Sequence, residues 1–151
     1  MSKLTSANDS DYIFGALLIA ANKMDTLLER SLKKYQVTAK QWFLLLLVIN
    51  LAESPTIKEA AAELGTSHQN VKQVALKLEQ KGMLRLEKDQ RDRRAIRLVA
   101  TEKSVEFWKA TKDDGDAFMR EFYTDIDHGQ MATARAFLSA IMQNLSRMEE
   151  I

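Results

Sequence analysis

The sequence predicts a mainly α-helical fold with one small β-hairpin, and three observations lead to this class. Apolar residues recur at spacings of three and four along most of the chain, which is the period of an amphipathic helix. One stretch near the middle alternates between apolar and polar residues instead, on both sides of a charged run. Only one proline and five glycines occur among 151 residues, which leaves little room for linkers or disorder.

Composition narrows the class of protein. The absence of cysteine excludes disulfides, thiol nucleophiles and cysteine-based metal sites. The longest apolar run, Trp42 to Ile49, is far shorter than the roughly 20 residues of a membrane-spanning helix, so we expect a buried helix and no membrane contact. Because the N-terminus does not resemble a signal peptide, we expect a cytoplasmic protein.

Two helices are expected in the first third of the chain. One covers roughly residues 10–34, and its apolar face consists of Ile13, Leu17, Ala20, Met24 and Leu27. Thr38, followed three residues later by Gln41, predicts a capping box that opens a second helix reaching about Glu53. The first helix needs a partner for its apolar face.

The next two helices form a helix-turn-helix. Thr56 and Glu59 predict a capping box for a short helix to about Leu64, which Gly65 ends. Ser67 can cap a fourth helix, with Asn70 at its third position, and Gly82 closes that helix where a left-handed residue is commonly needed. A turn of only a few residues joins the two helices, as in a helix-turn-helix.

A hairpin and two more helices complete the chain. Strands are expected at about 84–88 and 95–99, on either side of the charged loop 89–94. Thr101 is expected to cap a long helix whose apolar residues extend to Ile126, and Asp127 with Gln130 predicts a further capping box. The last helix keeps a seven-residue pattern through Met131, Ala134, Leu138, Ile141, Leu145 and Met148.

The net charge of +1 conceals an uneven distribution. Residues 38–100 carry 11 basic and 7 acidic side chains, whereas residues 101–151 carry 6 and 10. From Ser67 to Arg97 alone there are 9 basic and 4 acidic residues, a net charge of +5. A basic middle and an acidic C-terminal third indicate a polyanionic partner for the middle of the chain.

The fourth helix has two distinct faces at 100° per residue. Its inner face holds Val71, Val74, Ala75 and Leu78; its outer face holds Gln69, Lys72, Gln73 and Leu76, with His68 and Lys77 at the flanks. Amide and basic side chains are the groups that read base edges in a major groove. A solvated helix face is the alternative for such a helix taken alone, but three arginines in the adjacent hairpin loop favour nucleic-acid binding.

These residues resemble the winged helix-turn-helix of the MarR family of bacterial transcription regulators. The resemblance rests on the run Ser67-x-x-Asn70-Val71-Lys72-Gln73-Val74-x-x-x-Leu78-Glu79-x-x-Gly82-Met83-Leu84, then Asp89-x-Arg91-Asp92-x-Arg94 and Leu98-x-x-Thr101. It implies a winged helix-turn-helix core flanked by N- and C-terminal dimerisation helices, in three parts of one compact chain: 1–37, 38–100 and 101–151.

The resemblance implies a homodimeric repressor that binds double-stranded DNA at a pseudo-palindromic operator. The expected DNA-binding residues are Ser67, His68, Gln69, Asn70, Lys72, Gln73, Lys77, Arg91, Arg93 and Arg94. Arg91 would enter the minor groove, and Asp89 and Asp92 would shape the wing; pairing of these two acids with the loop arginines is also expected. The expected dimerisation residues are Ile13, Leu17, Leu138, Ile141, Leu145 and Met148. Apolar faces at both ends of so small a chain support a dimer independently, although packing within one subunit is the alternative.

Three positions depart from the family pattern. The family commonly has an arginine at the position of Gln73, an acidic residue at that of Leu76 and an arginine at that of Leu86. The usual base contacts and ion pair therefore do not carry over. Affinity is expected to depend more on Lys72, Lys77 and the wing.

Members of the family often respond to small aromatic or anionic effectors. The aromatic residues available to line such a site are Tyr12, Phe14, Trp42, Phe43, Phe107 and Trp108, but their helical spacing favours core packing, so no ligand is assigned. No cofactor or metal is expected, because the only histidines are His68 and His128. The run from Asp113 to Asp116 lacks the spacing of a calcium loop and is interpreted as a solvated helix bend.

Two other classes of function compete with a DNA-binding regulator. An enzyme is disfavoured, because the sequence has no phosphate-binding glycine loop, nucleophile elbow or metal-ligand cluster. A winged-helix module that binds protein or serves as a scaffold, without specific DNA binding, is the alternative. The basic wing argues against that alternative, whereas Gln73 and Leu86 leave it open.

Overall fold

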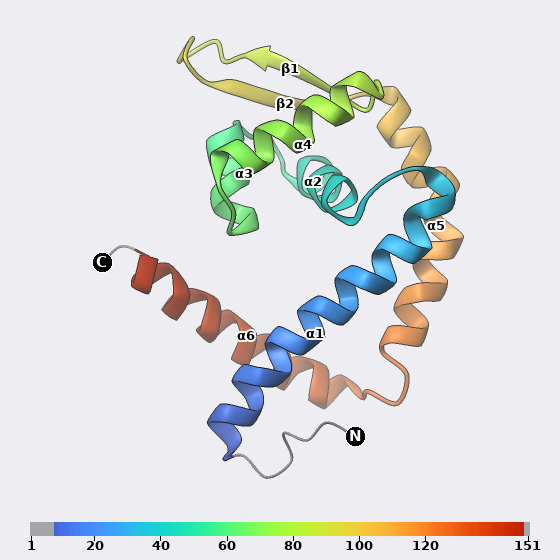
Figure 1. The fold of residues 1–151 in the computed structure, drawn as a ribbon, viewed down its shortest axis with the longest axis vertical. Coiled ribbons are helices and arrows are strands. Elements are labelled where there is room, and N and C mark those ends of the chain that lie inside the picture. The colour runs from blue at the N-terminus through green and yellow to red at the C-terminus, as the bar shows by residue number, and fades with distance from the viewer. Residues whose placement is uncertain (1–7, 150–151) are drawn as a thin grey trace. The chain divides into compact units, whose positions relative to one another are not determined.

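The computed structural model describes residues 8–149 and shows seven helices, including one short 3₁₀ turn, and one two-stranded sheet within that range (Figure 1). In chain order these are α1 (Asp9–Leu32), a 3₁₀ turn (Lys33–Tyr35), α2 (Ala39–Asn50), α3 (Ile57–Leu64), α4 (His68–Gln80), β1 (Leu84–Lys88), β2 (Ile96–Ala100), α5 (Glu102–Phe122) and α6 (His128–Glu149). The predicted fold class, mainly helical with one β-hairpin, is confirmed.

The chain divides into two compact units, residues 1–107 and 108–151, each of which we describe by itself. The boundary falls inside α5. The outermost residues of the predicted segments 1–37 and 101–151, namely 1–7 and 150–151, lie outside the described residues. The three-part division expected from the sequence stays a prediction.

Side-chain caps start the helices of the first unit where the sequence predicted them. Thr38 accepts a hydrogen bond from the amide of Gln41 at 3.2 Å, and the Gln41 side chain accepts one from the amide of Thr38 at 3.3 Å. Thr56 and Glu59 form the same reciprocal pair at 3.2 and 2.7 Å. Both predicted capping boxes are confirmed. Each satisfies backbone amides that the first helical turn leaves without a partner.

Helix α2 ends at Asn50, three residues before the predicted end at Glu53. Leu51 adopts an extended backbone, and the following residues lead to Pro55, which restricts Ser54 to non-helical conformations. The chain then runs beside β2: the amide of Leu98 donates to the Pro55 carbonyl at 2.8 Å, and Thr56 forms an isolated bridge with Arg97. The helix therefore ends at Asn50, and the segment from Leu51 to Thr56 leads to the contacts with β2.

The core of the first unit lies where α2, α3, α4 and the hairpin meet. Helix α4 packs against α2, α3 and β1, and α2 also contacts β2. The fully buried large side chains include Leu44, Leu45, Ile57, Leu78, Leu84 and Leu98. Phe43 is 51% exposed, so the prediction that the apolar run of α2 is buried on all sides is wrong at that position.

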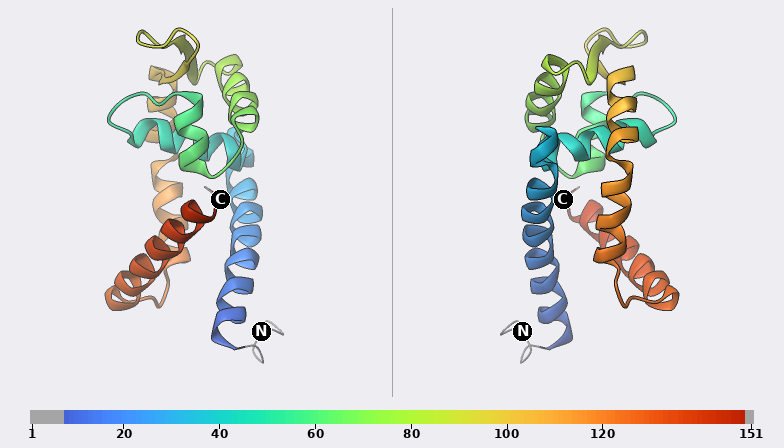
Figure 2. Two further views of the ribbon diagram at one scale, coloured as in Figure 1. Left: turned by 90° about the vertical axis from the view of Figure 1, so that its left-hand side faces the viewer. Right: turned by 90° about the vertical axis from the view of Figure 1, so that its right-hand side faces the viewer.

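The hairpin is antiparallel, and its register pairs Leu84 with Ala100 and Leu86 with Leu98. Its second strand begins at Ile96 rather than at residue 95, because Ala95 closes the loop. The Ala95 amide donates to the Asp92 carbonyl at 2.9 Å, and its carbonyl accepts from the Asp89 amide at 3.0 Å. Figures 1 and 2 show the loop of this hairpin projecting beyond the helices of its unit.

The second unit contains most of α5 and all of α6. Helix α5 ends at Phe122, so the prediction that places Ile126 on that helix is wrong: Ile126 lies in a turn that follows Asp125, whose φ is 61°. The predicted capping box is confirmed, with Asp127 accepting from the Gln130 amide at 2.8 Å and Gln130 accepting from the Asp127 amide at 2.9 Å.

Within the described part of the chain, no helix combines the length and apolarity needed to cross a membrane.

Two leucines on α4 provide a matched test of this packing. Leu78 is 0% exposed and Leu76 is 41% exposed, although they lie two residues apart. We expect Leu78→Ala to lower the free energy of unfolding by about 2 to 5 kcal/mol, because it removes buried methyl groups and leaves a cavity. Leu76→Ala should change it by less than about 1 kcal/mol. Urea denaturation of both variants checks this, and equal effects would contradict the packing of α4.

Candidate nucleic-acid interface

The turn between α3 and α4 holds the second helix by local contacts. Gly65 ends α3 with φ 60°, a left-handed conformation that suits glycine, and its amide donates to α3 carbonyls. Ser67 then caps α4 by accepting from the Asn70 amide at 3.2 Å, while the Asn70 side chain donates to the Thr66 hydroxyl at 3.2 Å. Two predicted DNA-binding residues, Ser67 and Asn70, therefore also shape the start of α4.

Helix α4 has the two faces that the sequence predicted. Val71, Ala75 and Leu78 are buried in the core, and Val74 is half-buried. The opposite surface, here called the outer face of α4, consists of exposed side chains: His68, Gln69, Lys72, Gln73, Leu76 and Lys77. Five of these six are the polar or basic residues predicted to contact DNA. Because α4 is capped and packed along its other side, this face is presented on a fixed backbone.

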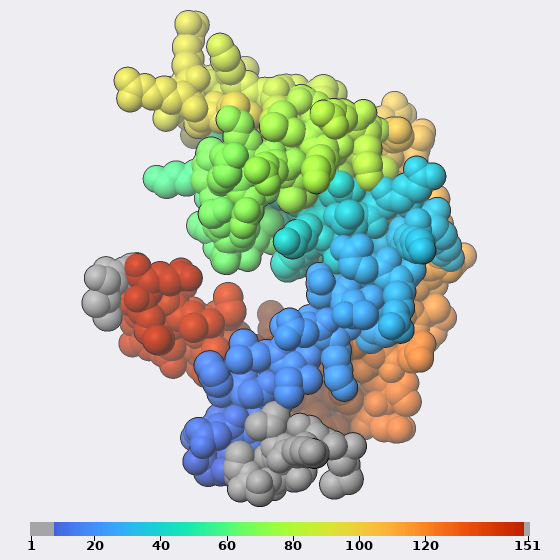
Figure 3. Space-filling view, in the orientation of Figure 1, coloured from blue at the N-terminus to red at the C-terminus, as the bar shows by residue number. Residues whose placement is uncertain are grey.

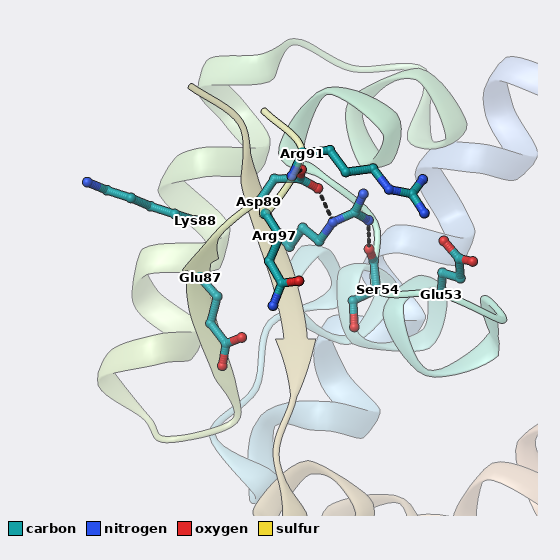
Figure 4. A pocket seen from close by; sticks show the side chains of 8 residues that line it. Glu53, Ser54, Glu87, Lys88, Asp89, Arg91 and Arg97 are labelled. Atoms are coloured by element: carbon teal, nitrogen blue, oxygen red, sulfur yellow. Dashed lines mark hydrogen bonds and ion pairs between the residues drawn. The ribbon is translucent and has the colours of Figure 1, made fainter. Parts of the chain in front are cut away.

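The wing, residues 84–100, is built around a buried carboxylate. Asp89 is only 4% exposed, and its Oδ1 accepts from the amides of Arg91 at 2.6 Å and Asp92 at 2.8 Å. Its Oδ2 accepts from the side chain of Arg97, which also donates to the carbonyl of Ser54. Figure 4 shows the Arg97 guanidinium lying between these two acceptors. The carboxylate therefore ties the wing loop to β2 and to the segment that follows α2.

Asp92 supports the second half of the wing loop. Its Oδ1 accepts from the Arg94 amide at 2.9 Å, in addition to the carbonyl contact with Ala95. The expectation that Asp89 and Asp92 pair with the loop arginine side chains is wrong: both carboxylates bind loop amides, and the ion pair of Asp89 is with Arg97. The backbone amides of the loop lie next to these carboxylates, so the carboxylate oxygens accept from the amides and not from the loop guanidinium groups.

The loop arginines are consequently left pointing outward. Arg91, Arg93 and Arg94 are exposed, and none forms an ion pair with an acidic residue of the described chain. In Figure 4 the Arg91 side chain extends from the loop towards the side on which Glu53 lies, whereas Lys88 extends away on the other side. Figure 3 shows side chains of the wing tip standing clear of the surface. They form an exposed basic projection beside α4.

Sequence reasoning missed Arg97 as a member of the site, although it counted its charge. Its two partners lie 8 and 43 residues away, so no local motif marks it. Its place between apolar Ile96 and Leu98 is the ordinary alternation of a strand, so nothing in the sequence indicated this role. Arg97 positions the loop that carries Arg91 by joining Asp89 to the Ser54 carbonyl.

The base of the wing is fastened to α4 and α5 by three polar contacts. Glu79 on α4 accepts from the Leu86 amide at 3.0 Å. The Thr101 hydroxyl donates to the Gly82 carbonyl at 2.7 Å, and Lys103 donates to the Lys81 carbonyl at 2.7 Å. Gly82 itself has φ 71°, which allows the sharp turn from α4 into β1. The hairpin therefore keeps a defined position relative to the outer face of α4.

The predicted dimerisation residues lie on helices whose apolar side chains are exposed. On α1, Ile13 and Leu17 are exposed together with Leu18, Met24 and Leu27. On α6, Leu138, Leu145 and Met148 are exposed and Ile141 is half-buried. Each helix on its own thus carries an apolar surface that its unit leaves in contact with solvent, although their part in dimerisation stays a prediction.

The aromatic residues considered for an effector site differ in burial. Phe107 is buried and meets Tyr35 edge-on, with ring centroids 6.0 Å apart, as the core interpretation expects. That interpretation is wrong for Tyr12, Phe14 and Phe43, which are exposed. Trp42 and Trp108 are half-buried.

The acidic and histidine side chains do not gather into a metal site in the described residues. Among residues 8–149, no group of three or more His, Asp or Glu side chains lies close enough to hold a metal ion. The acidic run from Asp113 to Asp116 is part of the continuous helix α5, where Asp116 pairs with Lys112 one turn earlier. The expected bend at that run stays a prediction. The hydrogen bond and ion pair between Lys112 and Asp116 raise the pKa of Lys112 and lower the pKa of Asp116.

Comparison with known proteins agrees with this geometry. A sequence model described as the MarR family matches residues 35–95, which include α2 to α4 and most of the wing. Over residues 35–95 the chain is therefore similar to the MarR family. Members of this family are transcriptional regulators rather than enzymes. No curated protein sequence matches the chain.

Solved structures of MarR proteins share the fold over nearly the whole chain. A MarR protein from Peptoclostridium difficile has 15% identity and a TM-score of 0.82, covering 98% of this chain and 95% of that one. The transcriptional regulator PA3341 has 26% identity and a TM-score of 0.76, covering 89% and 98%. CouR from Rhodococcus jostii, solved with bound p-coumaroyl-CoA, has 20% identity and a TM-score of 0.75, covering 93% and 96%.

The wing carboxylate gives the protein a testable pH dependence. Hydrogen bonds from the amides of Asp92 and Arg91, followed by Arg97, hold the pKa of Asp89 below its usual 3.8. Because the folded-state pKa is lowered, its contribution to stability is present above pH 3.8 and is lost as pH falls through the folded value.

We expect the amide resonances of Arg91 and Asp92 to titrate together with a midpoint below 3.8, as NMR can measure. In Asp89→Asn that shared titration should be absent, because the acceptor no longer changes charge. A midpoint at or above 3.8 in the unsubstituted protein would contradict the hydrogen bonds from the loop amides and the pairing with Arg97.

Proposed function

We propose that this protein is a sequence-specific, double-stranded-DNA-binding transcriptional regulator, acting as a homodimeric, ligand-responsive repressor at a pseudo-palindromic operator. The observation that carries the proposal is the outer face of α4 lying beside a wing whose loop arginines, Arg91, Arg93 and Arg94, have no acidic partner in the described chain. The uncharged amides of Gln69 and Gln73 can pair with base edges in a major groove, and Lys72 and Lys77 can contact bases or phosphates. The wing arginines can reach the adjacent backbone or minor groove.

Electrostatics supports DNA as the partner. The net charge of +5 from Ser67 to Arg97 surrounds the proposed contact surface, and neutralising phosphates releases condensed counterions. The acidic C-terminal third is expected to stay away from the phosphates. A protein partner for the same surface, as in the scaffold alternative, would not require a cluster of unpaired arginines at a loop tip.

Homodimerisation is supported by the exposed apolar helices at both ends of the chain. Exposed apolar surface of this extent is unusual on a monomer and marks interaction sites. In a two-fold dimer, two α4 helices would meet successive major grooves on one side of the duplex, and the operator would share the symmetry of the protein.

The effector we propose is a small aromatic or anionic molecule. CouR, which shares the fold, was solved with p-coumaroyl-CoA bound, and this ligand is both aromatic and anionic. The exposed rings of Tyr12, Phe14 and Phe43 are available to such a ligand. Measuring whether a panel of aromatic acids and their thioesters releases DNA from the protein tests this part of the proposal.

Arg91→Ala is the sharpest test of the DNA contact. We expect it to weaken DNA binding by about 1 to 3 kcal/mol and to reduce the slope of log K against log salt by about one, because one cationic contact is lost. Fluorescence anisotropy across a salt titration measures both. Arg85→Ala is the matched control, since Arg85 is an exposed wing arginine already paired with Glu87 at 2.9 Å, and it should have a much smaller effect.

Unchanged affinity and salt slope in Arg91→Ala would count against the wing contact. A Lys72→Ala, Arg91→Ala double variant that still binds genomic DNA like the unsubstituted protein would favour the scaffold alternative instead.

Leu145→Glu tests the dimer. Leu145 is 46% exposed on α6, and a two-fold interface changes it in both copies. We expect the dimer dissociation constant to rise about a hundredfold or more, because two leucine burials are lost. Sedimentation velocity measures this shift. Gln143→Glu is the matched control, since Gln143 is exposed about half a turn away on the same helix, and an equal response of both variants would contradict the proposed face.

A further inference from the structure

One apolar side chain interrupts the polar outer face of α4. Between residues 52 and 104, all of which the structure describes, Leu76 is the only large hydrophobic residue that is exposed. Lys72 and Gln73 lie one turn before it on the same face, and Lys77 follows it. The other large apolar residues of α4 face inward, so Leu76 is a single apolar spot within a basic and amide surface.

Contacts within one helical turn fix the position of Leu76. Glu79, three residues later on the adjoining turn, accepts from the Leu86 amide of β1 at 3.0 Å. The wing strand and α4 are therefore joined next to Leu76. Leu78, two residues away, is fully buried and holds the helix against the core. Leu76 is thus exposed on a supported backbone and needs no rearrangement to meet a partner.

The surroundings of Leu76 restrict what that partner is. A surface of lysine and glutamine side chains with a net positive charge is complementary to DNA and not to an apolar protein patch. In the major groove the base edges present hydrogen-bond donors and acceptors and one apolar group, the 5-methyl of thymine. A leucine among these neighbours therefore has one favourable contact available in the groove.

We propose that Leu76 is a specificity-determining residue that packs against the 5-methyl group of one thymine in each operator half-site. This inference rests on the proposed function as a DNA-binding regulator. On this inference, the uncharged side chain of Leu76 selects one base pair, next to those contacted by Gln73 and Lys72. The thymine is recognised by its methyl group, and the recognition is independent of salt.

Replacing thymine with deoxyuridine tests this directly, because the substitution removes only the methyl group. The full-length protein first selects its preferred duplex from random DNA, and each thymine of the selected half-site is then replaced in turn. We expect one position per half-site at which deoxyuridine weakens binding about fourfold, the factor for losing burial of one methyl group. Leu76→Ala should bind the thymine and deoxyuridine duplexes with equal affinity.

Leu51→Ala is the matched control, because Leu51 is an exposed leucine outside α4, and it should keep the full dependence on the methyl group. Circular dichroism and the melting temperature verify that Leu76→Ala is folded.

Three results would overturn the inference: a selected operator without thymine, a flat deoxyuridine scan, or a methyl dependence that persists in Leu76→Ala. Equal weakening of both duplexes by Leu76→Ala, with the dependence intact, would assign Leu76 to supporting the Glu79–Leu86 contact. Failure to select any preferred duplex would instead contradict the proposed function, and this inference with it.

Discussion

The exposed basic tip of the wing depends on the buried carboxylate of Asp89. A charge removed from water is costly unless its acceptors are satisfied, and here two loop amides and one guanidinium satisfy them. Arg97 is stabilised in turn by the Ser54 carbonyl. One carboxylate thus organises the end of β1, the loop, β2 and the segment after α2. The loop has little apolar core of its own, so this polar cluster takes the place of one.

The same cluster explains why the loop arginines face outward. Asp89 and Asp92 bind loop amides rather than the loop guanidinium groups, so Arg91, Arg93 and Arg94 keep their charge available. The contacts of Leu98 with Pro55 and of Leu86 with Glu79 then hold the hairpin against both α2–α3 and α4. A wing and helix face that are ordered before binding lose less conformational entropy when a partner engages them.

The sequence predicted the features that depend on neighbouring residues. Capping boxes at Thr38, Thr56 and Asp127, the cap at Ser67 and the glycine turns are local, and the structure contains each of them. The two faces of α4 follow from helical period alone. The misplaced features depend on distant contacts: α2 ends early because Pro55 lies beside β2, and Arg97 acts through Ser54, 43 residues away. The exposure of Phe43 likewise depends on which tertiary neighbours are present.

The outer face of α4 combines charged with uncharged side chains, and this bears on how such a surface would discriminate between sequences. Lysines and wing arginines supply attraction to phosphates that depends on salt and is largely indifferent to sequence. Gln73 and Leu76 add an amide and an apolar side chain to the exposed face that also carries Lys72. Uncharged groups distinguish base pairs by the fit of donors, acceptors and methyl groups. Under the proposed function, the lysines and the wing would supply affinity, while Gln73 and Leu76 would supply selectivity that persists at high salt.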